Sequence, residues 1–550
     1  MTSAPRSATR ELLSLIKPYR STMFASILCG ILGGLSVTAL LATVNQGLHN
    51  EAGIDSQVVL AFVGLCAVAL LASIAADIGS NSVGQRVIAL LRKDLGAKVL
   101  SAPIEQIERY RTHRLIPVLT HDVDTISDFA FAFAPLAISM TVVLGCLGYL
   151  ATLSLPIFTL TLLAIGIGSA VQFVAQSKGL QGFHAARDAE DNLQKHYQAI
   201  SEGAKELRIH RPRRQRMLKD NIQGTADFIC QTHIRAINIF VIAKSFGSML
   251  FFVVIGLALA MQSIWPNTNP EVMSGFVLVL LYMKGPLENL IGNLPIVGRA
   301  QIAFRRIADL SERFSSPEPH LLLETPPQAP PALHSLELRN VHYAFPAVDG
   351  NAPFTLGPIN LDVGAGEILF IVGENGCGKT TLIKLLLGLY SPQQGEIRVN
   401  GQAVAPEGLD EYRQMFTTVF ADYFLFEDVL SSDRAIPQDA TQYLQRLEIA
   451  HKVRVKDGRF TTTDLSTGQR KRLALVNAWL DERPVLVFDE WAADQDPTFR
   501  RIFYTELLPD LKRMGKTIVV ISHDDRYFDI ADQLIRLQTG KVVSDQPALA

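Results

Sequence analysis

Six apolar runs in this chain are each long enough to cross a lipid bilayer. They lie at about 21–44, 57–78, 129–151, 155–176, 237–261 and 272–298. A helical span needs about 20 mostly apolar residues to cross about 30 Å of hydrocarbon. The last run is the weakest, because Lys284, Pro286 and Glu288 interrupt it. Charged residues make up only 19% of the chain, below the roughly 25% of soluble domains. The first part of the chain is therefore predicted to be a polytopic α-helical membrane domain.

The charges of the connecting segments predict how the spans are oriented. The connections near 45–56, 152–155 and 262–271 contain no Lys or Arg, whereas 79–128 and 178–236 are rich in both. Basic connections usually stay in the cytoplasm. Both long stretches and both termini are therefore predicted to be cytoplasmic, which agrees with an even number of spans. The first run is long and lacks a nearby cleavage site, so it is interpreted as an uncleaved span.

The two basic connections are predicted to be helical hairpins. Apolar residues recur with helical spacing at 87, 90, 91, 95 and 99, and unstructured loops longer than about 12–15 residues are uncommon in compact proteins. We therefore expect the membrane helices to continue into the cytoplasm and to turn back near Thr120–Ile126 and Glu202–Ile209. The alternative is that these stretches are basic helices on the membrane surface.

Four ionisable residues fall within the predicted spans, namely Asp77, Lys244, Lys284 and Glu288. Ionisable groups inside a membrane are costly and usually functional. They are candidates for a polar cavity, and the alternative is a position at the membrane edge.

A proline-rich segment separates the membrane domain from a second domain. Prolines occur at 317, 319, 326, 327, 330 and 331. Proline lacks the N–H that helices and sheets use, so the segment is predicted to be a stiff, extended linker. The predicted domains are residues 1–315 for the membrane domain, 316–334 for the linker and 335–550 for a soluble α/β domain. The net charge of -2 does not favour nucleic-acid binding, and the five scattered cysteines form no disulfide framework or CxxC metal site.

The second domain contains a predicted phosphate-binding loop. The sequence GENGCGKTT follows an apolar strand-like run and precedes a helical one, which is the P-loop pattern. Its residues are Gly373, Glu374, Asn375, Gly376, Cys377, Gly378, Lys379, Thr380 and Thr381. Backbone N–H groups are expected to bind phosphate, Lys379 to reach the β- and γ-phosphates, and Thr380 to bind Mg²⁺. The side chain of Cys377 is expected to point outward without a redox role.

Two further strand-like runs end in residues suited to nucleotide hydrolysis. The run 485–488 leads to Asp489 and Glu490, and the run 517–521 leads to Ser522 and His523. Ligands bind at the carboxyl ends of strands in doubly wound sheets. Asp489 is therefore predicted to hold Mg²⁺, Glu490 to polarise the attacking water, and His523 to donate to the γ-phosphate. Taken alone, a histidine such as His523 is more often structural.

The stretch LSTGQ at 465–469 opens a predicted helix whose Ser466 and Gly468 can bind phosphate. Together with the P-loop, the two acids and the histidine, it resembles the ABC transporters. The resemblance covers essentially the whole chain, because six spans before one cassette is the plan of an exporter half-transporter. The blocks DEWAADQDP at 489–497 and ISHDDRYF at 521–528 resemble the bacterial cyclic-peptide and siderophore exporters, and most of all exporters of pyoverdine-type siderophore precursors.

The resemblance implies a bacterial inner-membrane exporter that uses ATP and Mg²⁺ and works as a homodimer. ATP would lie between Lys379 of one copy and the LSTGQ residues of the second, including Gln469. Asp496 would communicate between the two ATP sites. Phe345 falls where a tyrosine usually stacks on adenine, with Tyr343 as a near alternative. The alternatives for function are a lipid or drug exporter, and a membrane-anchored regulator that binds ATP without turnover.

One position departs from the family pattern. Exporters usually show V-x-Q-D-x-x-L-F after a strand, and here residues 419–426 place Ala421 at the glutamine position. Alanine cannot bind Mg²⁺ or a water, so the link between the γ-phosphate and the membrane domain is expected to be altered. Asp422 either substitutes through a water or is a structural carboxylate.

Overall fold

The computed structural model describes residues 17–48, 56–110, 112–264, 270–318, 321–322, 332–346, 353–429, 439–481 and 483–547. Its contacts divide the chain into two compact units. The membrane unit comprises Met1–Ala102 and Gln106–Ser316, and the cassette unit comprises Pro103–Glu105 and Pro317–Ala550. The prolines at 326–331, on which the predicted stiff linker depends, lie outside the described residues.

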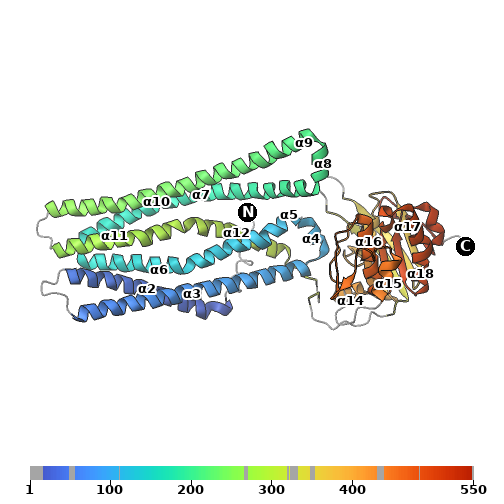
Figure 1. The fold of residues 1–550 in the computed structure, drawn as a ribbon, viewed down its shortest axis with the longest axis horizontal. Helices are drawn as coiled ribbons and strands as arrows, with labels where there is room; N and C mark the ends of the chain where they lie inside the picture. The colour runs from blue at the N-terminus through green and yellow to red at the C-terminus, as the bar shows by residue number, and fades with distance from the viewer. Residues whose placement is uncertain are drawn as a thin grey trace. The chain divides into compact units, whose positions relative to one another are not determined.

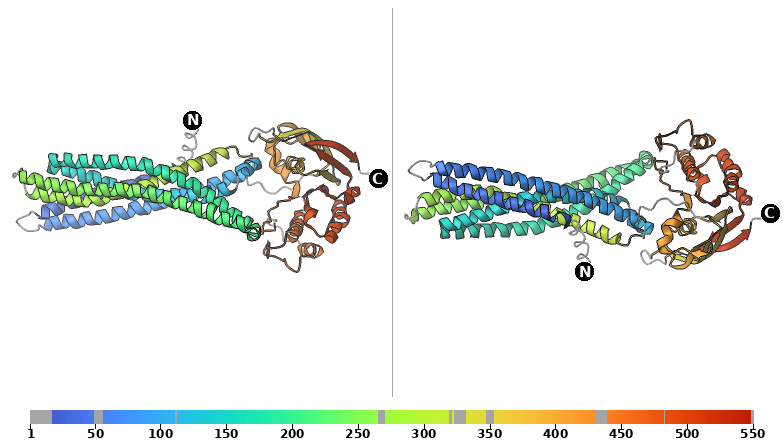
Figure 2. Two further views of the ribbon diagram at one scale, coloured as in Figure 1. Left: turned by 90° about the horizontal axis from the view of Figure 1, so that it is seen from above. Right: turned by 90° about the horizontal axis from the view of Figure 1, so that it is seen from below.

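The membrane unit is a bundle of long helices (Figure 1). Its main helices are α2 (Arg20–Leu48), α3 (Ser56–Ser101), α6 (Val123–Leu153), α7 (Leu155–Glu202), α10 (Gly224–Ile264), α11 (Pro270–Gly292) and α12 (Leu294–Arg313). Six helical stretches among the described residues are long and apolar enough to span a membrane, as the sequence predicts. Figure 2 shows from two more sides that α7 and α10 run together along the bundle.

The helices are far longer than a bilayer requires. α3 has 46 residues and α7 has 48, so each is about 70 Å long at about 1.5 Å per residue. The second hairpin turns at Gly203, between α7 and α8 (Ala204–Ile209), where the sequence predicts it. The predicted position of the first turn is wrong, because Thr120–Ile126 lies in η2 (Val118–Asp122) and α6.

The first hairpin turns instead between α3 and α4 (Ile104–Tyr110). Pro103 is the physical reason, since a proline disfavours helical conformation in the residue before it. The remaining short elements of this unit are η1 (Lys17–Tyr19), α5 (Thr112–Pro117), α9 (Arg211–Arg216) and η3 (Met217–Gln223).

Apolar side chains of the membrane unit face outward as well as inward. Phe24, Leu60 and Phe173 are large apolar residues that are mostly exposed, as lipid-facing positions require. Inside the bundle, small residues allow close contact between helices. At Gly34 of α2, an added Cβ would lie 2.8 Å from the Cβ of Thr141 on α6, so a larger residue there would push these helices apart.

The cassette unit is built on two main sheets. The six-stranded sheet has the order β12 (Lys541–Pro547), β11 (Gln533–Gln538), β3 (Ile368–Gly373), β10 (Thr517–Ile521), β9 (Val485–Asp489) and β6 (Phe416–Val419). The four-stranded antiparallel sheet has the order β2 (Thr355–Gly364), β1 (Ser335–Ala344), β4 (Gln394–Val399) and β5 (Gln402–Ala403). A small third sheet pairs β7 (Val455–Lys456) with β8 (Arg459–Phe460).

The helices of this unit are α13 (Lys379–Leu386), α14 (Leu409–Arg413), α15 (Asp439–Arg446), α16 (Thr467–Leu480), α17 (Pro497–Ile502) and α18 (Leu508–Arg513). Short helical turns are η4 (Pro406–Gly408), η5 (Trp491–Asp494), η6 (Phe503–Leu507) and η7 (Asp525–Ile530). The predicted fold class, a helical membrane domain followed by an α/β P-loop cassette, is confirmed.

The central strands are buried on both faces. Every residue of β9 and β10 is buried, and apolar clusters pack on either side of the large sheet. β3, β10 and β9 are parallel neighbours, with Ile521 paired to Ile371 and to Asp489. Their carboxyl ends therefore meet at one edge of the sheet, where such sheets bind ligands.

Candidate functional site

The P-loop joins β3 to α13, and its backbone requires glycine. Gly373 and Gly378 have φ of +152° and +107°, which L side chains rarely adopt. A Cβ on Gly373 would collide with the carbonyl oxygen of Leu537. A Cβ on Gly378 would lie 2.9 Å from the ring of Phe354. The loop conformation is therefore set by its glycines and by close neighbours on β11 and β2.

Lys379 begins α13 and is almost fully buried, at 6% exposure. Its ammonium donates to the carbonyl oxygens of Gly373 and Glu374, at 2.9 and 3.1 Å. Glu374, Asn375 and Gly376 are exposed. A ligand can therefore reach this part of the loop from solvent. The loop thus curls around one buried positive charge, which suits a phosphate group.

The prediction that the Cys377 side chain points outward is wrong. The residue is buried and belongs to the apolar cluster beneath the loop, with Leu382 and Leu537. The reason is the tight turn between Gly376 and Gly378, which directs the intervening side chain inward. Cysteine behaves there as a small apolar residue, and only its backbone remains a candidate for phosphate binding.

Thr380 and Asp489 form a pair of oxygen donors at the sheet edge. The Thr380 hydroxyl donates to Oδ2 of Asp489 at 3.2 Å. Asp489 is 1% exposed, and its Oδ1 has no hydrogen-bond partner among the described residues. Burial raises the pKa of the Asp489 carboxyl above its ordinary value, and the charges of Glu490 and Asp422 add to the rise. Mg²⁺ typically takes one or two protein oxygens and completes its shell with phosphates and waters, so this pair fits the ion.

Glu490 and His523 face each other beside this pair. Nε2 of His523 lies 3.1 Å from Oε1 of Glu490. Both residues line a pocket of about 360 Å³ with Ser522 and Asp524. A carboxylate and an imidazole in contact can hold a water and a phosphate oxygen between them.

Lys471 of α16 supports Glu490, and the sequence does not single it out. Its ammonium is 1% exposed and donates to the Glu490 carbonyl oxygen at 3.0 Å. It also pairs with Asp494 at 2.8 Å. Glu490 has a φ of +50°, a conformation that costs free energy outside glycine. Lys471 stabilises that conformation, yet in the sequence it is one basic residue within Arg470-Lys471-Arg472.

The LSTGQ stretch caps α16 and is braced by the block after Glu490. Ser466 and Gln469 form a reciprocal capping box. The Gly468 carbonyl oxygen accepts from the side chain of Gln495 at 3.0 Å. Trp491 donates its indole N–H to the Lys471 carbonyl oxygen at 2.8 Å. The DEWAADQDP block is thus packed against the LSTGQ helix within the same chain.

Asp496 caps α17 and contacts α16. Its carboxylate accepts from the Phe499 N–H at 2.9 Å, and this hydrogen bond holds the pKa of Asp496 below its ordinary value. The same carboxylate pairs with Arg472 of α16 at 2.8 Å. Asp496 therefore connects the LSTGQ helix with the segment that follows Glu490.

The aromatic residues near β1 distinguish the two adenine-stacking candidates. Tyr343 is 2% exposed and packs within the core, 5.2 Å from Phe345 between ring centroids. Phe345 is only partly buried and lies 6.3 Å from Phe354, the residue beside Gly378. Tyr343 therefore lacks a free ring face, and Phe345 remains the candidate.

Ala421 and Asp422 follow β6, and both are exposed. Asp422 lies near enough to Asp489 for its charge to raise the pKa of the Asp489 carboxyl. The next residue, Tyr423, reaches toward α16, with its hydroxyl 3.5 Å from the Thr467 carbonyl oxygen. Asp422 therefore acts on Asp489 through its charge, and a contact through a water stays a prediction.

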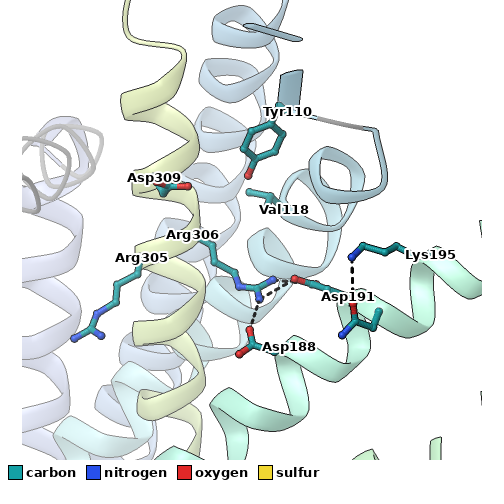
Figure 3. A pocket seen from close by; sticks show the side chains of 9 residues that line it. Tyr110, Val118, Asp188, Asp191, Lys195, Arg305, Arg306 and Asp309 are labelled. Carbon is teal, nitrogen blue, oxygen red and sulfur yellow. Dashed lines mark hydrogen bonds and ion pairs between the residues drawn. The ribbon is translucent and has the colours of Figure 1, made fainter. Parts of the chain in front are cut away.

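The membrane unit contains a cluster of charges that connects three elements, and Figure 3 shows the part of it between α12 and α7. Arg306 of α12 pairs with Asp191 of α7 at 2.9 Å and with Asp188 at 3.5 Å, whereas Arg305 points away. Arg187 of α7 pairs with the buried Asp122 of η2 at 2.7 Å. We call Asp122, Arg187, Asp188, Asp191 and Arg306 the charge cluster. The charge cluster links elements that are distant in sequence. The sequence analysis predicts basic hairpins in this region but not these ion pairs.

Three of the ionisable residues in the spans lie together. Lys284 and Glu288 of α11 pair at 3.8 Å, and the Lys284 ammonium lies 4.7 Å from the Phe252 ring centre. Lys244 of α10 and Glu288 line a hollow of about 400 Å³. Asp77 is exposed on α3. The described part of the bundle therefore supports a polar hollow for Lys244 and Glu288.

Comparison with known proteins identifies the family. Residues 22–263 match the model of the ABC transporter transmembrane region, and residues 356–493 match the model of the ABC transporter. ATP-binding protein SyrD of Pseudomonas syringae pv. syringae is 36% identical over 533 residues, which cover 95% of this chain and 94% of that protein. The chain is an ABC transporter. As an exporter of this family, it hydrolyses ATP and couples hydrolysis to transport.

More distant relatives share the transporter's full length. The ATP-dependent lipid A-core flippase of Alkalilimnicola ehrlichii is 25% identical over 563 residues, with 97% of this chain and 92% of that protein covered. A solved structure, a bacterial Atm1-family ABC exporter with ATP bound, superposes with a TM-score of 0.76 at 18% identity. It covers 97% of this chain and 96% of that one, and it establishes the fold of the transporter.

Proposed function

We propose that this transporter exports a siderophore precursor or a cyclic peptide across the bacterial inner membrane. The observation that carries the ATP-driven cycle is the Glu490–His523 pair, 3.1 Å apart at the sheet edge that also holds the P-loop. The substrate class rests on the DEWAADQDP and ISHDDRYF blocks. The packing of Trp491 and Gln495 against α16 gives the first block a structural role in the ATP site.

In the proposed mechanism, Lys379 and the P-loop backbone bind the phosphates of ATP. Thr380 and Asp489 would hold Mg²⁺, which supplies positive charge to the phosphate oxygens. Glu490 accepts the proton of the attacking water, and His523 donates toward the γ-phosphate. Lys471 keeps the Glu490 backbone in position through its 3.0 Å hydrogen bond.

We infer further that the functional unit is a homodimer. The chain carries one cassette, and Ser466 lies exposed at the N-terminus of α16, where it can meet the nucleotide of a second copy. A two-fold dimer is also the commonest symmetric assembly. Two equivalent sites would then form, with both cassettes and both pairs of termini in the cytoplasm, as the basic connections favour.

One other function has specific support. Relatives named lipid A-core flippases favour a lipid exporter, and the wider alternative is a drug exporter. The third alternative, a membrane-anchored regulator that binds ATP without turnover, is excluded, because the chain belongs to a family that couples ATP hydrolysis to transport.

The deciding experiment compares a deletion strain complemented with wild type and with Glu490→Gln. Intracellular accumulation of one peptide in the Glu490→Gln strain, with its appearance outside wild-type cells, would support the proposal. Accumulation of a lipid, or unchanged peptide export, would overturn the substrate assignment.

ATP hydrolysis by the purified proteins tests the role of Glu490. Wild type should release phosphate, whereas Glu490→Gln should bind ATP without turnover. Equal rates of hydrolysis in the two proteins would show that Glu490 is not the general base.

A further inference from the structure

The membrane unit contains a further, partly open cavity of about 540 Å³, lined mainly by residues of α6, α7, α10 and α11. Its walls are almost wholly apolar, with Met140, Leu250 and Leu287 on three of these helices. None of the described lining residues is Asp, Glu, Lys, Arg or His. A volume of about 300–1,000 Å³ is typical of pockets for small molecules, so the cavity is large enough for one apolar group with a short linker.

Gln172 of α7 is the exception within this lining. Its side chain is 4% exposed, and neither its Oε1 nor its Nε2 has a hydrogen-bond partner in the described part of the chain. The other buried polar residue of the cavity, Thr161, donates to the Ile157 carbonyl oxygen at 2.9 Å. Buried amides are nearly always paired, and an unpaired one is costly. Gln172 is therefore a donor and an acceptor left open toward an apolar space.

We infer that this cavity is a substrate subsite in which Gln172 pairs with an uncharged amide of the exported molecule. This assignment rests on the proposed function, because it presumes an exported substrate. A primary amide offers an N–H and a C=O side by side, and either the C=O or the N–H of a secondary amide can pair with one of them. An adjoining apolar group of the substrate fills the remaining volume.

The chemistry of the walls disfavours charged groups and acyl chains at the Gln172 position. A phosphate or carboxylate would enter without a cation to pair with it, and an ammonium would enter without an anion. A lipid acyl chain would suit the apolar walls but would leave both Gln172 groups unpaired. The charged parts of a substrate find partners elsewhere, such as the hollow lined by Lys244 and Glu288.

The test uses two uncharged probes that differ only at the amide, N-phenethylhexanamide and phenethyl hexanoate. Binding of each is measured by calorimetry to the full-length transporter in phospholipid nanodiscs. The wild type should bind the amide about tenfold more tightly than the ester, which is the value of one net hydrogen bond. Gln172→Leu keeps the volume and removes the polar atoms, so it should lose the preference for the amide, whose N–H would then be buried without a partner.

Gln176→Leu is the matched control, because Gln176 lies one helical turn further along α7, lines the same cavity and is half-buried. It should retain the preference for the amide. Gln172→Met is a second volume-matched variant in case the leucine variant folds poorly. Equal binding of both probes to wild type, no binding of the amide, or a preference that persists without Gln172 would each overturn the subsite.

ATP hydrolysis in the same preparations separates this inference from the proposed function. Both Gln172 variants should retain the basal rate, because Gln172 is remote from the cassette in sequence and takes no part in nucleotide binding. A wild type that prefers the amide but hydrolyses no ATP would overturn the exporter and leave the subsite standing. Normal hydrolysis without amide preference would overturn the subsite alone.

Discussion

The cassette unit and the membrane unit bury polar side chains in different ways. In the cassette, Lys379, Asp489 and Lys471 are buried near one sheet edge, and each has a partner in or beside a recognisable motif. In the membrane unit, Asp122 of η2 and Gln172 of α7 are buried far apart in sequence and outside any motif. Parallel strands bring their carboxyl ends to one place, whereas long helices distribute their contacts along their length.

The comparison teaches that buried polar residues serve different ends in the two units. Those of the cassette lie around an ATP site open to solvent, so their loss is expected to lower turnover more than stability. Those of the charge cluster hold helices to one another, so their loss is expected to lower stability first. The predictions below test this division.

The largest effect is expected in the charge cluster. Asp122→Ala removes the buried carboxylate that pairs with Arg187, whose side chain is 13% exposed, and leaves Glu190 at 2.8 Å as its remaining partner. Removing one partner of a buried ion pair typically costs about 3–5 kcal/mol, and the remaining pair with Glu190 places this variant at the lower end of that range. The measurement is thermal unfolding of the detergent-solubilised protein. The matched control is Asp124→Ala, which removes the exposed pair with Arg92 and should cost less than about 1 kcal/mol. Equal shifts in the two variants would contradict a stabilising cluster.

Next in size is the loss of the P-loop charge. Lys379→Met should lower the rate of ATP hydrolysis by about 10²–10³, as removal of a transition-state donor typically does, with little change in melting temperature. Phosphate release and binding of a fluorescent ATP analogue measure the two steps. Lys384→Met, on the same helix, is the control and should hydrolyse ATP normally. If Lys379→Met lowered the melting temperature as much as Asp122→Ala does, the two units would not differ in how their buried polar residues contribute to stability.

A smaller effect is expected for the residue that positions Glu490. Lys471→Met removes the donor to the Glu490 carbonyl oxygen and should reduce kcat about tenfold, with KM for ATP nearly unchanged. The control is Arg470→Met, because Arg470 is exposed. Steady-state kinetics distinguish the outcomes, since a raised KM with an unchanged kcat would mean that Lys471 acts on binding and not on the base.

The smallest effect concerns pH. The pKa of the buried Asp489 carboxyl is raised, so this group takes up a proton at a higher pH than an exposed aspartate. Protonation competes with Mg²⁺, and the Mg²⁺ concentration for half-maximal ATP hydrolysis should therefore rise several-fold between about pH 7.5 and about pH 5.5. Without metal, the stability of the folded state should change in the opposite direction. A raised carboxyl pKa means that the folded state binds the proton more tightly than the unfolded chain, so the free energy of unfolding rises as the pH falls through that pKa. If the half-maximal Mg²⁺ concentration changes with pH only as much as Mg²⁺ binding to free ATP does, Asp489 is not a ligand of the ion.

Much of the cassette site could be predicted because each motif is local. The P-loop needs its glycines in order, and Asp489, Glu490 and His523 each follow a buried strand. Lys471 could not be predicted, because its role depends on where α16 packs against the residue after β9. The inward direction of Cys377 and the burial of Tyr343 likewise depend on neighbours contributed by other strands.

The sequence by itself determined that there are six spans, an ATP cassette and a set of phosphate-binding residues, because apolar length and motif spacing are properties of contiguous chain. Pro103 also marks the first hairpin turn in the sequence, although helical periodicity alone does not locate that turn. Only the tertiary structure decided that Arg306 meets Asp188 and Asp191, and that Gln172 faces an apolar cavity without a hydrogen-bond partner among the described residues. Those facts depend on which helix faces lie opposite one another, and helix packing sets that through contacts between residues far apart in the chain.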